Sequence, residues 1–300
     1  MKIGIIGLGH VGSTVAYTLL LENLADELVL IDTNLDKLNA EVLEMQDVSQ
    51  NLGANVRILP EPVINGTSDD PSKKLFIKPD YAMLADADFV IFSAADLSSM
   101  KMRDRLGELP ITSRIVEEVA PKLKASGFSG ILLSISNPCD VIAQYLWQQT
   151  GFPVNKVIGT GALLDTNRLK NRTKRQDVLI LGEHGESQVA VGNVSDELAN
   201  EARLSGWNIF KVNNYTRFGI AACVARILRT IIDETGEELP VSTYDKTADS
   251  YYSALTKLDR NGVIFRRLPD LTEKEQAGLD QSIARIKDFY AKIDGEVPLC

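Results

Sequence analysis

The feature that most constrains the fold is a glycine-rich turn near the start of the chain. A β-rich run, KIGII (residues 2–6), leads into Gly7, Gly9 and Gly12, and apolar residues at helical spacing follow. In a G-x-G-x-x-G turn the first glycine permits the turn, the second lets the backbone approach a pyrophosphate, and the third lets the helix pack on the strand. The pyrophosphate would lie at the helix N-terminus, where free N–H groups point at it. The candidate cofactor-binding residues of this turn are Gly7, Gly9, His10, Val11 and Gly12.

A carboxylate at the end of the next strand makes the turn more specific. The apolar run ELVLI (27–31) ends in Asp32, twenty residues after Gly12. A carboxylate in this place accepts hydrogen bonds from a ribose 2′-hydroxyl and repels a 2′-phosphate. The turn alone is a weak indication of nucleotide binding, because an ordinary glycine-rich loop can have the same sequence pattern. Together with Asp32 it predicts a site for NAD rather than NADP.

Strands and helices then alternate along the first half of the chain. Each expected strand is nearly continuous in apolar residues, which is typical of a parallel sheet covered on both faces. Ligands of such sheets bind at the carboxyl ends of the strands, where Gly7, Asp32, Ala94 and Asn137 fall. The expected elements are helices over 36–48 and 111–127 and strands over 86–95 and 130–138. A last amphipathic helix over 272–293 starts with Thr272 and Glu275 at capping-box spacing.

Composition excludes several classes of protein. The formal net charge of −9, from 41 acidic and 32 basic residues, argues against a nucleic-acid partner. There is no run of about 18 apolar residues to span a membrane, and the N-terminal run has no cleavage signal for export. The three cysteines, Cys139, Cys223 and Cys300, are odd in number and lack metal-ligand spacing. We expect a cytoplasmic protein without a metal.

One of the two histidines lies in a glycine-flanked turn, LGEHGESQ (181–188). By itself, His184 is more readily a structural residue than a catalytic one, because most histidines take no part in chemistry. The rest of the chain changes this balance. In order, it contains GIIGLGHVGSTVA, LIDTN, ISNPCDVI, GFPVNKVIGTGALLDTNRL, LGEHGESQ and NYTRFGIA.

With these motifs the chain resembles the lactate and malate dehydrogenase family, and most closely its L-2-hydroxyisocaproate dehydrogenase branch. The resemblance implies an α/β fold in which a Rossmann-type doubly wound parallel sheet is followed by a mixed α/β substrate domain. The NAD-binding domain would span 1–158, and the substrate-binding and catalytic domain 159–300. The implied activity is an NAD-dependent oxidoreductase that interconverts L-2-hydroxy acids and 2-oxo acids. The implied assembly is a homodimer or homotetramer.

The family's chemistry gives roles to three residues. Reduction of a 2-oxo acid takes a hydride from the nicotinamide and a proton from the protein, and an imidazole can donate that proton near neutral pH. His184 matches the family's catalytic histidine, and Asp165 matches the carboxylate that holds its other ring nitrogen. Arg168, on the same helical face as Asp165, would bind the substrate carboxylate through two hydrogen bonds.

A further arginine should polarise the substrate carbonyl from a closing loop. The loop reads DLSSMKMRDRLGELP (96–110), and both Arg103 and Arg105 are candidates. Alignment by the helix that follows favours Arg105 as the catalytic residue, with Arg103 as a solvated charge. The loop would also exclude water and strengthen the interaction with the developing oxyanion.

Three residues complete the implied site. The resemblance implies that Asn137 hydrogen-bonds near the ribose or the carbonyl, that Thr216 lines the substrate pocket, and that Ile220 presses on the nicotinamide. Each of them has an alternative interpretation as an ordinary core or strand-end residue.

The closing loop also bears on the substrate. Relatives that act on malate carry an arginine about six residues before the polarising one, but here that stretch holds Leu97, Ser98, Ser99 and Met100. A second carboxylate would be left unpaired, which favours monocarboxylates. Ser99 and Met100, as substrate-binding residues, leave room for an alkyl group. We therefore predict medium-chain or branched acids such as 2-hydroxyisocaproate, with L-lactate and then L-malate as alternatives. A non-catalytic NAD-binding protein is the alternative of a different class.

Overall fold

The computed structural model describes residues 1–62, 79–95 and 105–294. One nine-stranded sheet, in the order β11-β10-β9-β6-β5-β4-β1-β2-β3, runs through this part of the chain. The six strands from β3 to β6 are parallel, and this order is that of a dinucleotide-binding doubly wound sheet. They are β1 (Lys2–Ile6), β2 (Glu27–Ile31), β3 (Arg57–Leu59), β4 (Phe89–Phe92), β5 (Ile131–Ser134) and β6 (Val157–Gly159).

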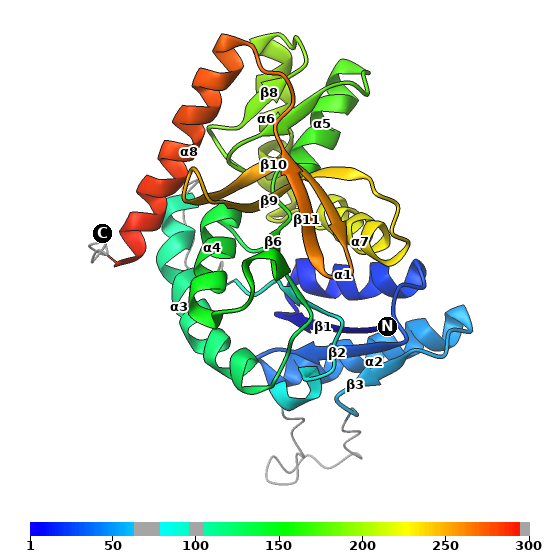
Figure 1. Cartoon of the computed structure of the whole chain (residues 1–300). Helices are drawn as coiled ribbons and strands as arrows, with labels where there is room; N and C mark the ends of the chain where they lie inside the picture. Colours follow the sequence, from blue (N-terminus) through cyan, green and yellow to red (C-terminus); the bar gives the residue numbers. More distant parts are fainter. Residues whose placement is uncertain (63–78, 96–104, 295–300) are drawn as a thin grey trace.

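Helices cover both faces of the parallel strands, as the apolar runs predict (Figure 1). Alternate residues of β4 face opposite cores: Phe89 and Ile91 pack with α1 and α2, whereas Val90 and Phe92 pack with α3 and α4. The fold class predicted from the sequence is therefore confirmed. These helices are α1 (His10–Leu21), α2 (Leu35–Leu52), α3 (Arg105–Ala125) and α4 (Cys139–Thr150), with the short 3-10 helices η2 (Tyr81–Leu84) and η3 (Val154–Lys156).

The second half of the chain is a mixture of helices and antiparallel strands. A meander of three strands extends the sheet through an antiparallel pair between Gly159 of β6 and Ser242 of β9. The sheet thus continues across the boundary expected at 158/159, which stays a prediction. The strands are β7 (Leu179–Leu181), β8 (Val189–Val191), β9 (Glu238–Asp245), β10 (Ser250–Asp259) and β11 (Gly262–Arg267), and the helices are α5 (Leu163–Thr173), α6 (Asp196–Asn213), α7 (Phe218–Ile232) and α8 (Glu273–Asp294).

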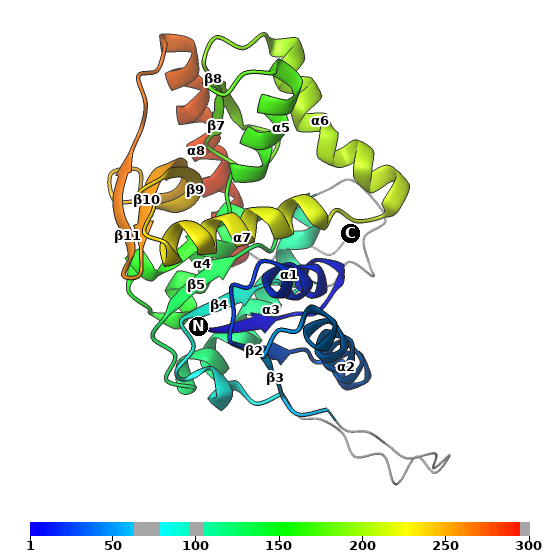
Figure 2. The same cartoon turned by 90° about the vertical axis from the view of Figure 1, so that its right-hand side faces the viewer.

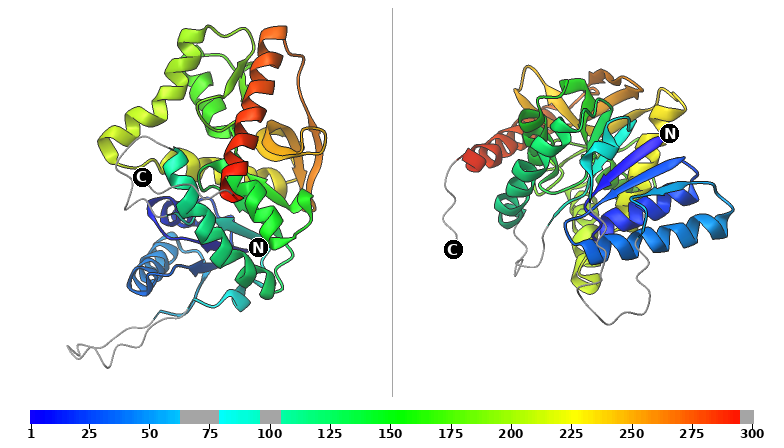
Figure 3. Two further views of the ribbon diagram at one scale, coloured as in Figure 1. Left: turned by 90° about the vertical axis from the view of Figure 1, so that its left-hand side faces the viewer. Right: turned by 90° about the horizontal axis from the view of Figure 1, so that it is seen from below.

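Helices of the second half lie over the carboxyl ends of the parallel strands. Helix α7 packs on α1 and α5, and α6 packs on α5 and extends beyond it (Figure 2). Helix α8 runs along the side of the molecule next to α3 and α4 (Figure 3). The edge of the sheet where ligands are expected is therefore enclosed by α5, α6 and α7.

Local sequence fixes where several helices begin and end. Asn34 caps α2 by accepting the N–H of Lys37, and Gly53 ends this helix with a left-handed φ of 64°. The capping box predicted for the last helix is present: Thr272 N donates to Glu275 at 2.8 Å, and Glu275 N donates to the Thr272 hydroxyl at 3.3 Å. Within the described ranges, none of the helices combines the length and the apolar character that a membrane crossing requires.

Candidate active site

The glycine turn has the shape that a pyrophosphate needs. Gly7 has a φ of +92°, and a Cβ on Gly12 would lie 1.9 Å from the Gly7 carbonyl oxygen, so strand and helix meet where a side chain cannot fit. A Cβ on Gly9 would meet nothing within 4 Å. Gly9 is the N-cap of α1 and no side chain caps it, which leaves amide N–H groups directed at open space.

Asp32 lies beside this turn at the end of β2. Its carboxylate accepts the backbone N–H of Leu8 at 2.7 Å and that of Asn34 at 2.8 Å. Two bonds leave further lone pairs of the carboxylate for ribose hydroxyls. The turn and Asp32 therefore fit the pyrophosphate and the ribose of NAD.

His10 connects the nucleotide turn to the second half of the chain. It is the first residue of α1, and its ring stacks on Tyr215 with 3.9 Å between centroids and 20° between planes. Tyr215 directly precedes Thr216, and Thr216 lines the cavity described below. The residues expected to bind cofactor and substrate are thus linked by one aromatic contact.

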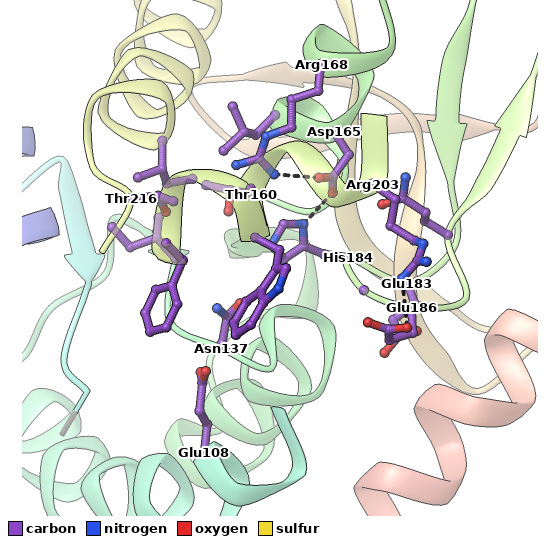
Figure 4. Close-up of a pocket in the computed structure, with 18 of the residues that line it drawn as sticks. Glu108, Asn137, Thr160, Asp165, Arg168, Glu183, His184, Glu186, Arg203 and Thr216 are labelled. Atoms are coloured by element: carbon purple, nitrogen blue, oxygen red, sulfur yellow. Dashed lines mark hydrogen bonds and ion pairs between the residues drawn. The ribbon is translucent and has the colours of Figure 1, made fainter. Parts of the chain in front are cut away.

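A histidine, an aspartate and an arginine form the centre of the second half (Figure 4). His184 Nδ1 lies 2.5 Å from one oxygen of Asp165, and the other oxygen of Asp165 accepts a hydrogen bond from Arg168 at 2.9 Å. Asp165 and Arg168 are one turn apart on α5, and His184 comes from the connection between β7 and β8. Their side chains are 5%, 14% and 14% exposed, respectively. The structure brings the three residues together as the sequence predicts.

These side chains border a cavity of about 430 Å³ at the carboxyl ends of the parallel strands. Both halves of the chain contribute to its walls, because Val11 and Asn137 come from the nucleotide-binding half. Of the residues predicted from the sequence, those that line it are Val11, Asn137, Asp165, Arg168, His184, Thr216 and Ile220. Gly7, Gly9, His10, Gly12, Asp32 and Ala94 lie along the same edge of the sheet, outside this cavity.

The two described cysteines are buried. Burial raises the pKa of the Cys139 thiol and that of the Cys223 thiol to about 12, so both stay protonated near neutral pH. The described residues contain no group of three or more His, Cys, Asp or Glu side chains that could hold a metal ion. The remaining cysteine, Cys300, lies outside the described residues.

Comparison with known proteins decides the family. The protein-family model that describes the lactate/malate dehydrogenase NAD-binding domain matches residues 1–159 of this sequence. L-lactate dehydrogenase 1 of Bifidobacterium longum subsp. longum is 31% identical over 323 residues, with 96% of each chain covered. L-lactate dehydrogenase 2 of Listeria innocua is 30% identical, over 97% of this chain and 99% of the relative. The chain belongs to the lactate/malate dehydrogenase family.

Solved structures of the family agree in fold over the whole length. The minor L-lactate dehydrogenase of Enterococcus mundtii superimposes with a TM-score of 0.84 at 27% identity, over 98% of this chain and 99% of that one. The malate dehydrogenase of Archaeoglobus fulgidus, solved with NADH, gives 0.83 at 25% identity with the same coverage. This family member is thus an NAD-dependent 2-hydroxyacid dehydrogenase, and the predicted cofactor is confirmed.

The loop that we predict to close over the site, residues 96–110, lies largely outside the described residues. Ser99, Met100 and Arg103 belong to the part that the structure does not describe. Arg105 is the first residue of α3, and its side chain is likewise outside the description. The roles predicted for these residues stay predictions.

The sequence did not indicate the wall that α6 contributes to the cavity. Arg203, Gly206, Trp207 and Phe210 line it at i, i+3, i+4 and i+7, the spacing of one helical face. A Cβ on Gly206 would lie 2.9 to 3.0 Å from the guanidinium of Arg168, so the absent side chain lets α6 seat on that arginine. The spacing can be recognised in the sequence, but the sequence alone does not show that this helical face lines the cavity.

Proposed function

We propose that this dehydrogenase reduces a monocarboxylic 2-oxo acid to the L-2-hydroxy acid, with pyruvate and L-lactate as its main pair. The observation that carries the proposal is the contact of Asp165 with both His184 and Arg168 at a cavity next to the nucleotide turn. The names of the relatives favour lactate over 2-hydroxyisocaproate. Medium-chain or branched acids are the second candidate, because the cavity of about 430 Å³ has the apolar walls Leu164, Trp207 and Phe210.

In this proposal Arg168 and His184 act on the two neighbouring polar groups of the substrate. The guanidinium of Arg168 binds the carboxylate, which orients the C2 carbonyl toward His184. The Nδ1–H of His184 donates to Asp165, so the other ring nitrogen faces the substrate and gives its proton to the carbonyl oxygen. NADH held by the nucleotide turn and Asp32 would supply the hydride for C2. In the reverse direction the neutral ring accepts the hydroxyl proton.

The remaining roles are proposed on the predicted residues. Arg105 would polarise the carbonyl and stabilise its developing negative charge. Asn137 and Thr216 would contact the substrate, and Ile220 the nicotinamide, because all three line the cavity. The rest of the dinucleotide would be held by Gly7, Gly9, His10, Val11, Gly12, Asp32 and Ala94. The substrate side chain would be bordered by Ser99 and Met100. The two domains would span residues 1–158 and 159–300.

A second copy of the chain is the proposed partner. Large apolar side chains are exposed near the end of α6 and the start of α7: Ile209 is 44%, Val212 80% and Phe218 69% exposed. Exposed apolar clusters of this kind mark interfaces between proteins. Light scattering at micromolar concentration should give the mass of a dimer or tetramer, and Phe218→Asp should lower it. A monomer in both proteins would contradict the assembly.

A substrate panel tests the proposed function. NADH oxidation by the purified enzyme is followed with pyruvate, 2-oxoisocaproate, phenylpyruvate and oxaloacetate. The highest kcat/KM is expected with pyruvate, and oxaloacetate should be poor because its second carboxylate lacks a partner. The highest value on 2-oxoisocaproate would instead establish the second candidate. Turnover on none of the four would contradict the enzyme assignment.

A further inference from the structure

A second carboxylate holds the backbone of the turn that carries His184. Asp140 lies in the first turn of α4, and one oxygen of its side chain accepts the backbone N–H of His184 at 2.8 Å. The contact joins residues 44 positions apart in the sequence. Asp140 is 2% exposed, so its carboxylate is shielded from water, and the loss of hydration costs free energy when the group is ionised. A charge is rarely buried unless its contacts compensate for it.

We infer that Asp140 is a positioning residue for His184, holding the backbone that carries the imidazole and placing a negative charge beside it. The inference rests on the proposed role of His184 as proton donor. His184 is then fixed at two atoms, Nδ1 by Asp165 from α5 and the backbone N by Asp140 from α4. Two anchors from two helices restrict both the place and the rotation of the ring, and proton transfer is sensitive to displacements of about 1 Å.

Few groups share the surroundings of Asp140. His184 and Glu183 face it from the β7–β8 connection, the hydroxyl of Ser242 from β9, and Cys139 precedes it on α4. Burial raises the pKa of Asp140 to about 6, with a small contribution from the charge of Glu183, whereas the Ser242 hydroxyl, the His184 amide and the His184 charge lower it. The favourable charge partner of an ionised Asp140 is therefore the imidazolium of His184.

Two substitutions separate the two effects. Asp140→Asn removes the charge but keeps an oxygen that can accept the His184 N–H. Asp140→Leu has a similar volume and removes both the charge and the acceptor. The matched control is Gln144→Leu. The Gln144 side chain is also buried on α4, and it also accepts a backbone N–H. Its donor is Tyr251 at 3.1 Å rather than His184.

The measurements are kcat and KM for pyruvate reduction, KM for NADH, and the NMR ring C–H signals of the only two histidines. For Asp140→Asn we expect kcat within about tenfold of wild type, because its amide oxygen can still accept the His184 N–H. For Asp140→Leu we expect kcat to fall by about 100-fold and the His184 ring signals to move, while KM for NADH stays within about twofold. Gln144→Leu should match wild type in kcat and in the His184 ring signals.

Each outcome decides for or against the inference. It is overturned if Asp140→Leu keeps more than about a third of the wild-type kcat, because a displaced ring should lose far more. It is also overturned if Asp140→Asn loses as much kcat as Asp140→Leu, because the retained acceptor would then have no effect. If Asp140→Leu does not fold, Asp140→Asn decides, and a kcat more than about 100-fold below wild type overturns the inference. A wild-type protein without turnover would overturn the proposed function, but the His184 ring signals would still report on the effect of Asp140.

Discussion

Asp165 shows how much of this site depends on single atoms. One of its oxygens contacts His184 and the other contacts Arg168, so one buried carboxylate orients both the proposed proton donor and the proposed substrate anchor. The resemblance to the dehydrogenase family predicted this cluster, and the spacing of three residues placed Asp165 and Arg168 on one helical face. The sequence did not indicate Asp140, because a side-chain contact to a backbone N–H 44 residues away produces no recognisable sequence pattern.

Gly12 provides a prediction for the nucleotide turn. In Gly12→Ala the new Cβ would lie 1.9 Å from the Gly7 carbonyl oxygen, so strand and helix must separate. We expect NADH affinity, measured by fluorescence titration, to fall at least about tenfold, because the pyrophosphate site depends on this close approach. Gly278→Ala is the control, since its Cβ would make only ordinary contacts of 3.5 Å or more. Equal affinity in the two variants would refute this account of the turn.

Asp140 also makes stability depend on pH. Burial raises its pKa from 3.8 to about 6, so the folded state binds the proton more tightly than the unfolded state. The resulting stabilisation is complete below pH 3.8 and is lost as the pH rises to about 6. The difference corresponds to about 3 kcal/mol of unfolding free energy. Urea denaturation at pH 4 and pH 7 should show this loss in wild type relative to Asp140→Asn, and parallel pH dependences would contradict it.

At the scale of elements, α6 is the part of the site that depends most on packing. The helix is capped by Ser195, which accepts the N–H of Leu198, and it turns its cavity-lining face toward α5. A Cβ on Gly206 would lie 2.9 Å from a guanidinium nitrogen of Arg168, so α6 has no room for a side chain there. The guanidinium is therefore positioned both by Asp165 on its own helix and by the packing of α6.

Gly206→Ala tests this dependence. The added Cβ would approach Arg168 to 2.9 Å, so the guanidinium must move from its bond to Asp165 or α6 must shift. We expect KM for pyruvate to rise about tenfold, because a displaced Arg168 loses part of its proposed bidentate hydrogen bonding to the carboxylate of pyruvate. The Kd for NADH should stay the same. Asn208→Ala, at an exposed position of the same helix, serves as control, and similar KM values in both variants would argue against the role of Gly206.

At the scale of the whole molecule, the parallel half was predictable and the joining of the two halves was not. Apolar runs followed by turn residues fix β1, β2, β4 and β5 locally, and the order of such strands follows from general rules of topology. The antiparallel extension depends on one pair, Gly159 with Ser242, between segments far apart in sequence. The cavity in turn is lined by residues of α5, α6 and α7 together with residues of the nucleotide-binding half, so it depends on how the two halves pack.

Single-turnover oxidation of NADH by pyruvate, compared between His184→Asn and wild type, tests the role of His184. The claim is that the imidazole held by Asp165 gives the proton to the 2-oxo acid. It predicts a rate at least about 100-fold lower at pH 7, with an unchanged Kd for NADH, as expected for loss of a general acid. A variant that keeps more than about a tenth of the wild-type rate would contradict the claim, because a general acid contributes more than that.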